Sequence, residues 1–277
     1  MSIENKILVT GAKGMLGQDL CPIFEDEGYE VIEAGHQDLD ITDYDKAKAF
    51  IEKIAPQIII QCAGYTNVDK AEEEPELAHL VNGIGTENLA KICGEKDILM
   101  VYISTDYVFD GESEKAYTPK DKTNPLSVYG KTKLEGENAV QKYCKKFYIA
   151  RTSWLYGHHG KNFVETMLSL KDNSEIKVVN DQKGCPTWTV DLSYGIMELI
   201  EENYDYGIYH VCGSGETTWY GFAHEIFNVA REKVNLKPCT TKDFPRPAHR
   251  PQNSVMENQE ICRDWKSALR EYIALRP

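Results

Sequence analysis

The sequence of 277 residues lacks several features that mark whole classes of protein. No apolar run approaches the roughly 18 residues that a membrane-spanning helix needs. The N-terminal stretch MSIENKILVTGAKG has no long apolar segment of the kind that signal peptides carry. Low-complexity tracts, internal repeats and Gly/Ser/Pro-rich linkers are also absent. We therefore expect a globular protein that is neither secreted nor embedded in a membrane.

Basic residues are in short supply. There are 31 Lys and Arg residues against 44 Asp and Glu residues, which gives a net charge of −13. Proteins that bind nucleic acids usually present an excess of positive charge to the phosphate backbone. The balance leaves room only for a local basic patch, so we expect no nucleic-acid partner.

Clustered cysteines are missing as well. The eight cysteines are scattered over positions 21, 62, 93, 144, 185, 212, 239 and 262, with no Cys-x-x-Cys pair. Several lie in apolar runs such as IIIQCAG, which favours buried free thiols in a reducing cytoplasm. The pair His158-His159 has no acidic or cysteine residues at ligand spacing, which indicates a loop. We assign no metal site.

Short apolar runs alternate with helical segments through the first half of the chain. The pattern predicts strands at 6–11, 29–35, 57–64, 97–105 and 147–157 and helices at 15–28, 42–56, 75–96 and 128–143. Thr42 is the expected N-cap of the second helix, and Pro56 follows its end. This alternation predicts an α/β protein with a doubly wound parallel sheet.

The pattern loosens after residue 157. Helices are expected in NFVETMLSLK, TVDLSYGIMELIEEN and TTWYGFAHEIFNVAREK, and another strand at 207–214. A segment dense in proline and arginine follows at 244–256. We predict a main domain over 1–157 and a smaller mixed α/β lobe over 158–277. Within the smaller lobe, a segment near 176–214 is expected to return to the main sheet.

A glycine-rich turn follows the first predicted strand. Gly11, Gly14 and Gly17 in TGAKGMLG open the first helix with the spacing Gly-x-x-Gly-x-x-Gly. Such glycines let the backbone turn tightly and approach a pyrophosphate, whose charge meets the helix N-terminus. A turn that binds nothing is the alternative, but the strand-turn-helix context favours a dinucleotide site. Residues 1–157 are therefore predicted to form a dinucleotide-binding domain.

The preference for NADH or NADPH stays open. An acidic residue at the tip of the second strand would hold the ribose hydroxyls of NAD, yet Ala34 and Gly35 lie there. Glu33 is on the alternate face of the strand. No arginine is present to bind a 2′-phosphate.

The spacing Tyr-x-x-x-Lys occurs twice, beginning at Tyr44 and at Tyr129. In a helix this spacing puts the phenol and the ammonium on one face. Tyr129 begins the helix that follows the strand ending at Thr105, and ligands bind at the carboxyl ends of parallel strands. Tyr44 lies in an earlier crossover helix, away from that edge. We select Tyr129 with Lys133 as the catalytic pair and expect Tyr44 at the surface.

The motifs TGAKGMLG, STDYVF, YGKTK and RTSWLYG together resemble the extended short-chain dehydrogenase/reductase superfamily. The longer set STDYVFDG, PLSVYGKTKLEGE, ARTSWLYG, NDQKGCPT and RPQNSVM, in this order, is similar to the dTDP-4-dehydrorhamnose reductase family. This resemblance implies a Rossmann-type domain and NAD(P)H-dependent reduction. The implied substrate is dTDP-4-dehydro-6-deoxy-L-mannose, and the implied product, dTDP-L-rhamnose, serves cell-surface polysaccharide synthesis.

The resemblance also implies residues. The catalytic triad falls on Thr105, Tyr129 and Lys133. Cofactor contacts fall, besides Gly11, Tyr129 and Lys133, on Gly14, Met15, Leu16, Asp40, Ile41, Cys62, Ala63, Gly64, Tyr65 and Thr66. Sugar-nucleotide contacts fall on Thr105, Asp106 and Trp154, although Trp154 could equally be a core residue. Some relatives bind Mg²⁺ at a subunit interface, but this sequence offers no convincing ligands for it.

The chemistry of these residues fits the reduction of a ketone. Tyrosine has a reference pKa near 10, and we expect the charge of Lys133 to favour its phenolate form. Thr105 would donate a hydrogen bond to the carbonyl oxygen as negative charge develops there. Arg246 and Arg250 in RPAHRPQNS are candidates for binding the substrate diphosphate, because guanidinium forks match phosphate oxygens.

Three other functions share these motifs. One is the reduction of another 4-keto sugar nucleotide, and the second is a non-catalytic regulatory subunit that keeps the dinucleotide site. The complete set of Thr105, Tyr129 and Lys133 argues against the regulatory subunit. The third is an epimerase or dehydratase, which is disfavoured because Asp106 is followed by Tyr107 and not by a second carboxylate. A homodimer is compatible with the sequence, and the oligomeric state stays open.

Overall fold

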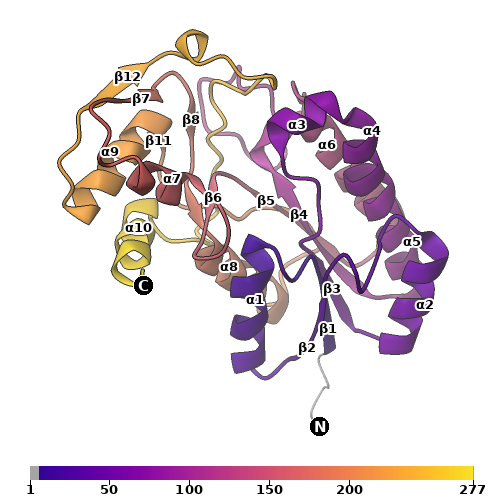
Figure 1. Ribbon diagram of the computed structural model, residues 1–277. Coiled ribbons are helices and arrows are strands. Elements are labelled where there is room, and N and C mark those ends of the chain that lie inside the picture. Colours follow the sequence, from indigo (N-terminus) through magenta and orange to yellow (C-terminus); the bar gives the residue numbers. More distant parts are fainter. Residues whose placement is uncertain (1–5, 277) are drawn as a thin grey trace.

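A six-stranded parallel sheet forms the centre of the protein. The structure is a computed structural model and describes residues 6–276. The strands lie in the order β10-β5-β4-β3-β1-β2 (Figure 1). Their bounds are β1 Lys6–Thr10, β2 Glu30–Ala34, β3 Ile58–Gln61, β4 Leu99–Thr105, β5 Phe147–Thr152 and β10 Gly207–His210. The prediction of a doubly wound parallel sheet is confirmed.

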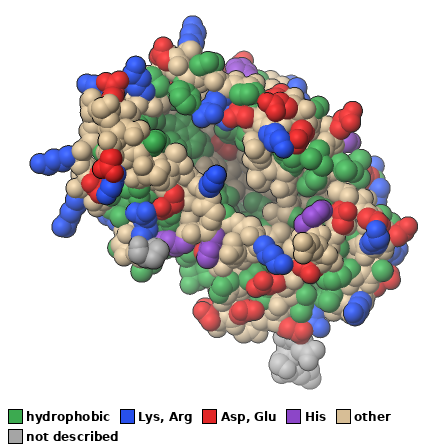
Figure 2. Space-filling view, viewed as in Figure 1, with side chains coloured by type: hydrophobic (Ala, Val, Ile, Leu, Met, Phe, Trp, Pro, Cys, Tyr) green, Lys and Arg blue, Asp and Glu red, His purple; other side chains and the backbone are tan. Residues whose placement is uncertain are grey.

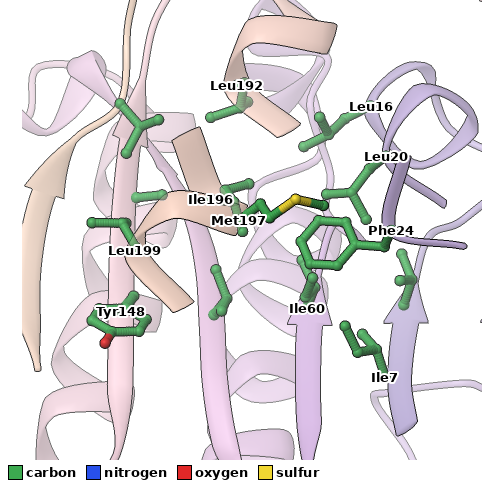
Figure 3. Packing of buried hydrophobic residues seen from close by; sticks show 14 of the residues in the cluster. Ile7, Leu16, Leu20, Phe24, Ile60, Tyr148, Leu192, Ile196, Met197 and Leu199 are labelled. Carbon is green, nitrogen blue, oxygen red and sulfur yellow. The ribbon is translucent and has the colours of Figure 1, made fainter. Parts of the chain in front are cut away.

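Helices cover both faces of this sheet. On one face, α1 (Met15–Asp26) and α8 (Thr189–Glu201) pack against each other. Leu16, Leu20 and Phe24 from α1 meet Ile196 and Met197 from α8 over the buried strand residues (Figure 3). The other face carries α2 (Tyr44–Ile54), α5 (Thr86–Lys96) and α6 (Val128–Tyr143). Both faces of the central strands β1, β3, β4 and β5 are thus largely buried, which explains their apolar runs, whereas the edge strands β2 and β10 are more exposed.

The start of α2 differs from the prediction. Its N-cap is Asp43, whose side chain accepts a hydrogen bond from the backbone N–H of Lys46. Thr42 was predicted to be this cap, but its hydroxyl donates to Asp40 Oδ1 at 2.7 Å instead. The predicted helix is therefore present and begins later than expected, because a carboxylate is the better acceptor next to the first turn.

The segment predicted as one helix over 75–96 is helical but not uniform. It begins as α4 (Pro75–Ala78), widens into the π-helix η1 (His79–Gly85) and continues as α5. A short helix that the sequence did not predict, α3 (Val68–Glu73), precedes it. π-turns within helices often occur at functional sites. Here the wide turns contain Asn82, which contacts the candidate site described below.

A smaller lobe lies beside the carboxyl end of the sheet (Figure 1). Its helices α7 (Phe163–Ser169), α9 (Trp219–Ala230) and α10 (Trp265–Ala274) share a hydrophobic core. Its strands form the pairs β6 (Leu155–Tyr156) with β9 (Thr187–Trp188), β7 (Ile176–Val179) with β12 (Leu236–Cys239), and β8 (Lys183–Gly184) with β11 (Thr217–Thr218). Two 3₁₀ turns, η2 (Asp106–Val108) and η3 (Thr241–Asp243), complete the elements of the described residues.

The chain returns from the smaller lobe to the main sheet once. In the segment predicted to return, near 176–214, α8 packs on the sheet and β10 pairs with β5. The first part does not return, because β7 pairs with β12 in the smaller lobe. The domain boundary at residue 157 stays a prediction, since contacts between the halves continue on both sides of it.

Two further properties follow from the described residues. All eight cysteines are free thiols, and most are buried, as the sequence predicted. No helix among residues 6–276 combines the length and the apolar character that crossing a membrane requires.

A buried ion pair fixes α6 to the sheet. Arg151 on β5 donates from Nε and Nη2 to the carboxylate of Glu137 on α6, at 2.8 and 2.7 Å. Ser104 on β4 donates to the same carboxylate at 2.5 Å. The two charged side chains are 3% and 0% exposed. Such a pair leaves an uncompensated charge in the interior when one partner is removed.

We expect Glu137→Gln to lower the free energy of unfolding by about 3–5 kcal/mol, because Arg151 would lose its counter-charge. The exposed pair of Asp97 and Lys146, 2.6 Å apart, offers a matched control. Asp97→Asn should change stability by less than about 1 kcal/mol. Urea denaturation of the two variants and the wild type measures both values, and equal losses would contradict the prediction.

Candidate active site

A cavity of about 800 Å³ opens at the carboxyl end of the main sheet. Figure 2 shows it as a hollow between the sheet domain and the smaller lobe. Its walls come from the turn after β1, the ends of β2 to β5, the start of α6 and part of the smaller lobe. This is the edge at which ligands bind in open α/β sheets.

The glycine turn fits a dinucleotide pyrophosphate. Gly11 has φ +68°, and a Cβ at this position would collide with the backbone of Ala63 on the neighbouring strand end. Gly14 is the N-cap of α1, and no side chain caps this helix. The backbone N–H groups of the first turn, including those of Met15 and Leu16, therefore face the cavity as donors for an anion.

The cavity continues past the end of β2 to Asp40 and Ile41, both predicted cofactor contacts. Asp40 Oδ1 accepts hydrogen bonds from the N–H and the hydroxyl of Thr42, which lower the pKa of Asp40. Asp40 therefore shapes its own loop as well as lining the cavity. The structure also places Lys13 and His36 here, two cationic or titratable side chains that the sequence did not single out.

Residues 62–66, the predicted cofactor contacts, line the same cavity, and they all follow β3 because this strand ends at Gln61 and not at residue 64. The sequence missed Asn82, the buried side chain that holds this turn. Asn82 Oδ1 accepts from the N–H of Tyr65 at 2.8 Å, and its Nδ2 donates to Tyr65 O and to Thr132 Oγ1 at 3.0 and 3.1 Å. One amide thus ties the cofactor-side turn to α6. In the sequence, only the position of this polar residue inside an apolar helical stretch could have indicated the role of Asn82.

Thr105, Tyr129 and Lys133 all line the cavity. Burial raises the pKa of Tyr129 to about 12, and a hydrogen bond with Thr105 acts in the opposite direction. Lys133 Nζ donates to Ile103 O at 2.6 Å and lies over the ring of Tyr102. The predicted lowering of the Tyr129 pKa by Lys133 is therefore not what the structure shows, because burial dominates. The phenol is protonated at neutral pH.

Lys133 itself is strongly affected by its surroundings. Burial lowers its pKa to about 7, although the carboxylate of Glu137, one helical turn further along α6, acts to raise it. Its ammonium is thus close to titration at neutral pH. A lysine in this condition can exchange a proton with its neighbours.

Asp106, a predicted substrate contact, is the neighbour of Thr105 and lines the cavity. Its side chain is buried, and burial raises its pKa to about 7. Thr105 Oγ1 donates to Asp106 Oδ1 at 3.0 Å, while Oδ2 has no hydrogen-bond partner among the described residues. Asp106 therefore has an acceptor or donor available for a ligand, depending on its protonation.

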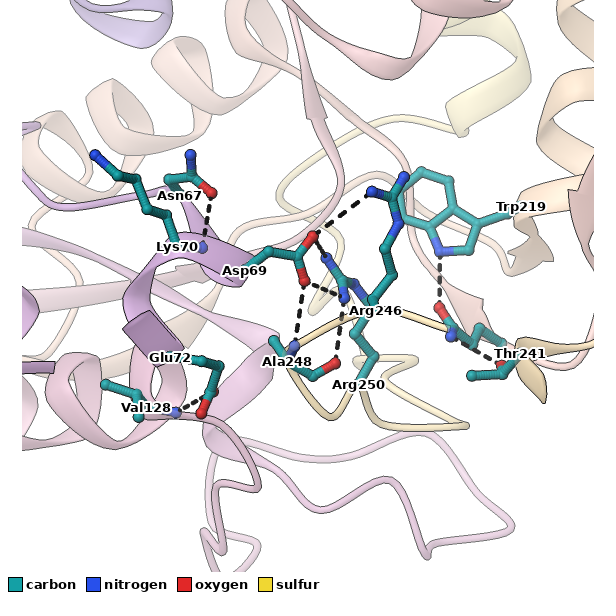
Figure 4. Close-up of polar contacts among 11 residues, drawn as sticks. Asn67, Asp69, Lys70, Glu72, Val128, Trp219, Thr241, Arg246, Ala248 and Arg250 are labelled. Atoms are coloured by element: carbon teal, nitrogen blue, oxygen red, sulfur yellow. Dashed lines mark hydrogen bonds and ion pairs between the residues drawn. The ribbon is translucent and has the colours of Figure 1, made fainter. Parts of the chain in front are cut away.

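Trp154 lines the cavity, together with Trp219 from the smaller lobe, which the sequence did not single out. The two predicted arginines do not line it. Arg250 forms a two-pronged ion pair with Asp69 on α3, at 2.8 and 3.0 Å (Figure 4), and faces a second cavity of about 650 Å³. Arg246 Nη1 is 4.0 Å from Asp69 Oδ2. Their role in binding a diphosphate stays a prediction.

The remaining predicted features lie elsewhere. The hydroxyl of Tyr44 donates to Glu95 at 3.0 Å, and Tyr44 does not line the cavity. His158 and His159 lie in the loop before α7, where His158 stacks on Tyr272. No group of three or more His, Cys, Asp or Glu side chains suited to a metal occurs among residues 6–276.

The pKa of Lys133 makes a prediction about stability in the protein without ligands. Because its folded pKa lies below the unfolded value, the unfolded state binds more protons between about pH 7 and pH 10.5, and wild-type stability rises with pH there. Lys133→Met lacks this gain. Its stability relative to the wild type should be highest near pH 6 and should fall towards pH 10.

Urea denaturation at several pH values measures this difference. Lys131→Met, at an exposed position of the same helix, is the matched control and should show little change with pH. If the free energy of unfolding of Lys133→Met relative to the wild type stays constant or rises with pH, the pKa of Lys133 is not lowered by folding.

Comparisons with known proteins agree with this geometry. The family model "RmlD substrate binding domain" matches residues 5–275. A dTDP-4-dehydrorhamnose reductase of Streptomyces griseus is 40% identical, over 95% of this chain and 91% of that protein. The spore coat polysaccharide biosynthesis protein SpsK of Bacillus subtilis is 39% identical over 98% of both chains.

Solved structures lead to the same family. A dTDP-4-dehydrorhamnose reductase of Clostridium acetobutylicum has a TM-score of 0.95 and 47% identity, over 98% of this chain and 99% of that one. The Bacillus anthracis enzyme of the same name, solved in complex with NADP, has a TM-score of 0.95, 38% identity and the same coverage. The chain belongs to the dTDP-4-dehydrorhamnose reductase family.

Proposed function

We propose that this protein uses NADPH or NADH to reduce the 4-keto group of dTDP-4-dehydro-6-deoxy-L-mannose, which gives dTDP-L-rhamnose for polysaccharide synthesis. The observation that carries the proposal is the meeting of Thr105, Tyr129 and Lys133 with the glycine turn in one cavity. Relatives at about 40% identity bear the name of this reductase, and one solved relative holds NADP.

The dinucleotide supplies a hydride to the sugar C4 when it is bound. Tyr129 is protonated at neutral pH and donates its proton to the ketone oxygen as negative charge develops there. Thr105 turns its hydroxyl from Asp106 to the same oxygen and stabilises that charge. One hydride on carbon and one proton on oxygen complete the alcohol.

Lys133 acts after the proton has left Tyr129. Its buried ammonium stabilises the phenolate, because an opposite charge in a site of low dielectric favours the charged form. Glu137 acts to keep this ammonium charged from within α6.

The sugar nucleotide occupies the side of the cavity nearest the smaller lobe. Asp106 and Trp154 line that side and are the proposed contacts with the sugar. Arg246 and Arg250 are the proposed partners of the diphosphate. Both lie on the segment that borders α3, and Asp69 holds Arg250 there.

A second 4-keto sugar nucleotide is also a candidate substrate. A dTDP-4-keto-6-deoxy-D-glucose reductase of Streptomyces niveus is 37% identical over 99% of this chain. The same residues would carry out the same chemistry on that epimeric substrate. Turnover of the two 4-keto sugars, measured as the loss of NADPH or NADH absorbance, shows which sugar is the substrate. The same assay gives the cofactor preference.

We further propose that the protein works in the cytoplasm, where its free thiols stay reduced, and that it forms a homodimer. Light scattering after size-exclusion chromatography gives the oligomeric state directly. A purely monomeric protein at working concentration would overturn the homodimer.

Tyr129→Phe should lower turnover by roughly 10²-fold or more, because the proton donor is lost while the ring remains. The affinity for the dinucleotide should be unchanged. Tyr44→Phe removes the hydroxyl from the other Tyr-x-x-x-Lys pair and is the matched control, with turnover near that of the wild type. Near wild-type turnover in Tyr129→Phe would remove this residue from the mechanism.

If Arg250 binds the diphosphate, Arg250→Ala should raise the KM for the nucleotide sugar by about 10-fold or more, the size of a lost charge-assisted contact. Asp69→Ala removes its partner but leaves the guanidinium, so KM should rise much less. Equal increases in the two variants would mean that the ion pair, and not a phosphate contact, is what matters.

A further inference from the structure

Trp219 forms the first turn of α9 and lines the cavity next to Trp154. The two indoles are stacked, with ring centroids 3.5 Å apart and planes 6° from parallel. Rings at this separation overlap almost completely and leave no room for another group between them. One face of Trp154 is therefore fully covered by Trp219.

The backbone at Gly184 comes close to one side of the Trp154 ring. A Cβ at Gly184 would lie well inside van der Waals distance of Cε2, Nε1 and Cζ2 of the Trp154 indole. Trp219 thus covers one face of the Trp154 ring, and Gly184 lies close to the side of the ring that carries Nε1.

Hydrogen bonds hold Trp219 in this place. Its Nε1 donates to Gln182 Oε1 at 3.2 Å, and Gln182 Nε2 donates to Thr241 Oγ1 at 3.0 Å (Figure 4). Thr241 is in turn bonded to Asp181. Gln182 is only 6% exposed, whereas the Asp181 end of these hydrogen bonds lies at the surface. Phe163 packs against Trp219 with a centroid separation of 4.6 Å.

The backbone of Trp154 is unusual as well. Its φ is +48°, in the left-handed region that bulky residues rarely adopt. Such conformations persist where the surroundings over-determine them, and they concentrate at functional sites. Here the stack and the close approach of Gly184 fix the side chain of that residue.

We propose that Trp219 is a positioning residue, which holds the Trp154 indole edge-on to the nucleotide sugar. The proposal rests on the function proposed above. The sugar cannot stack on the face of Trp154 that Trp219 covers. It meets the indole edge, whose Nε1–H has no hydrogen-bond acceptor among the described side chains and backbone groups and can donate to a sugar oxygen.

Three variants test this arrangement by steady-state kinetics. Trp219→Leu frees one face of Trp154 and should raise the KM for the nucleotide sugar by roughly 10-fold, the size of one displaced hydrogen bond. Trp219→Phe keeps an aromatic face and should restore most of this loss. Trp154→Phe keeps a ring but lacks the N–H, so it should resemble Trp219→Leu. The KM for the dinucleotide and kcat should change less than two-fold.

Tyr220→Leu is the matched control. Tyr220 is the next residue on α9 and packs in the core of the smaller lobe, but it does not line the cavity. The KM of Tyr220→Leu for the nucleotide sugar should match that of the wild type even if the helix is destabilised. Circular dichroism adds a readout independent of activity, since coupled stacked indoles give a paired far-ultraviolet signal. That signal should disappear in both Trp219 variants.

The outcomes separate this proposal from the proposed function. If the wild type reduces dTDP-4-dehydrorhamnose and the KM of Trp219→Leu is unchanged, the positioning role is wrong and the function stands. If the wild type reduces only another 4-keto sugar nucleotide, the function is wrong and the same comparison on that sugar still decides. A Trp154→Phe variant with wild-type KM would overturn the edge-on contact, and a wild type that reduces no sugar nucleotide would overturn both.

Discussion

The carboxylate of Glu137 and the guanidinium of Arg151 meet in the interior, where neither can be hydrated. Because Ser104 donates to the same carboxylate, this contact joins α6 to both β4 and β5. Tyr129 and Lys133 lie on α6, and Thr105 lies at the end of β4. The placement of Tyr129 and Lys133 relative to Thr105 therefore depends in part on this ion pair. The same carboxylate acts to raise the pKa of Lys133, so Glu137 affects both the position of α6 and the charge of this lysine.

Local sequence was sufficient for features whose cause is local. The apolar runs of the parallel strands, the glycine turn and the helix that begins after Ser127 depend on neighbouring residues, and they were predicted close to their observed positions. The choice of Tyr129 over Tyr44 needed only the order of strands and helices. The start of α2 was the exception, because Thr42 and Asp43 are both good caps and hydrogen bonds to Asp40 decide between them.

Features that depend on distant partners escaped prediction. Asn82 acts on Tyr65 and Thr132, which are 17 and 50 residues away. Arg250 is paired with Asp69, 181 residues earlier in the chain. The pKa of Tyr129 is set by burial, which spacing along a helix cannot reveal. In each case the missing information was the surroundings of a side chain, and not its identity.

The path of the chain constrains how the cavity can open. After β5 the chain leaves the sheet domain, it comes back with α8 and β10, and then it leaves again for β11 and α9. When such a cleft opens or closes, the hinges are the few loop residues that connect its two walls. Here every connection would have to bend together, while the Arg250–Asp69 pair joins the walls at a further point. Any widening of the cavity would therefore have to break or carry along the Arg250–Asp69 contact.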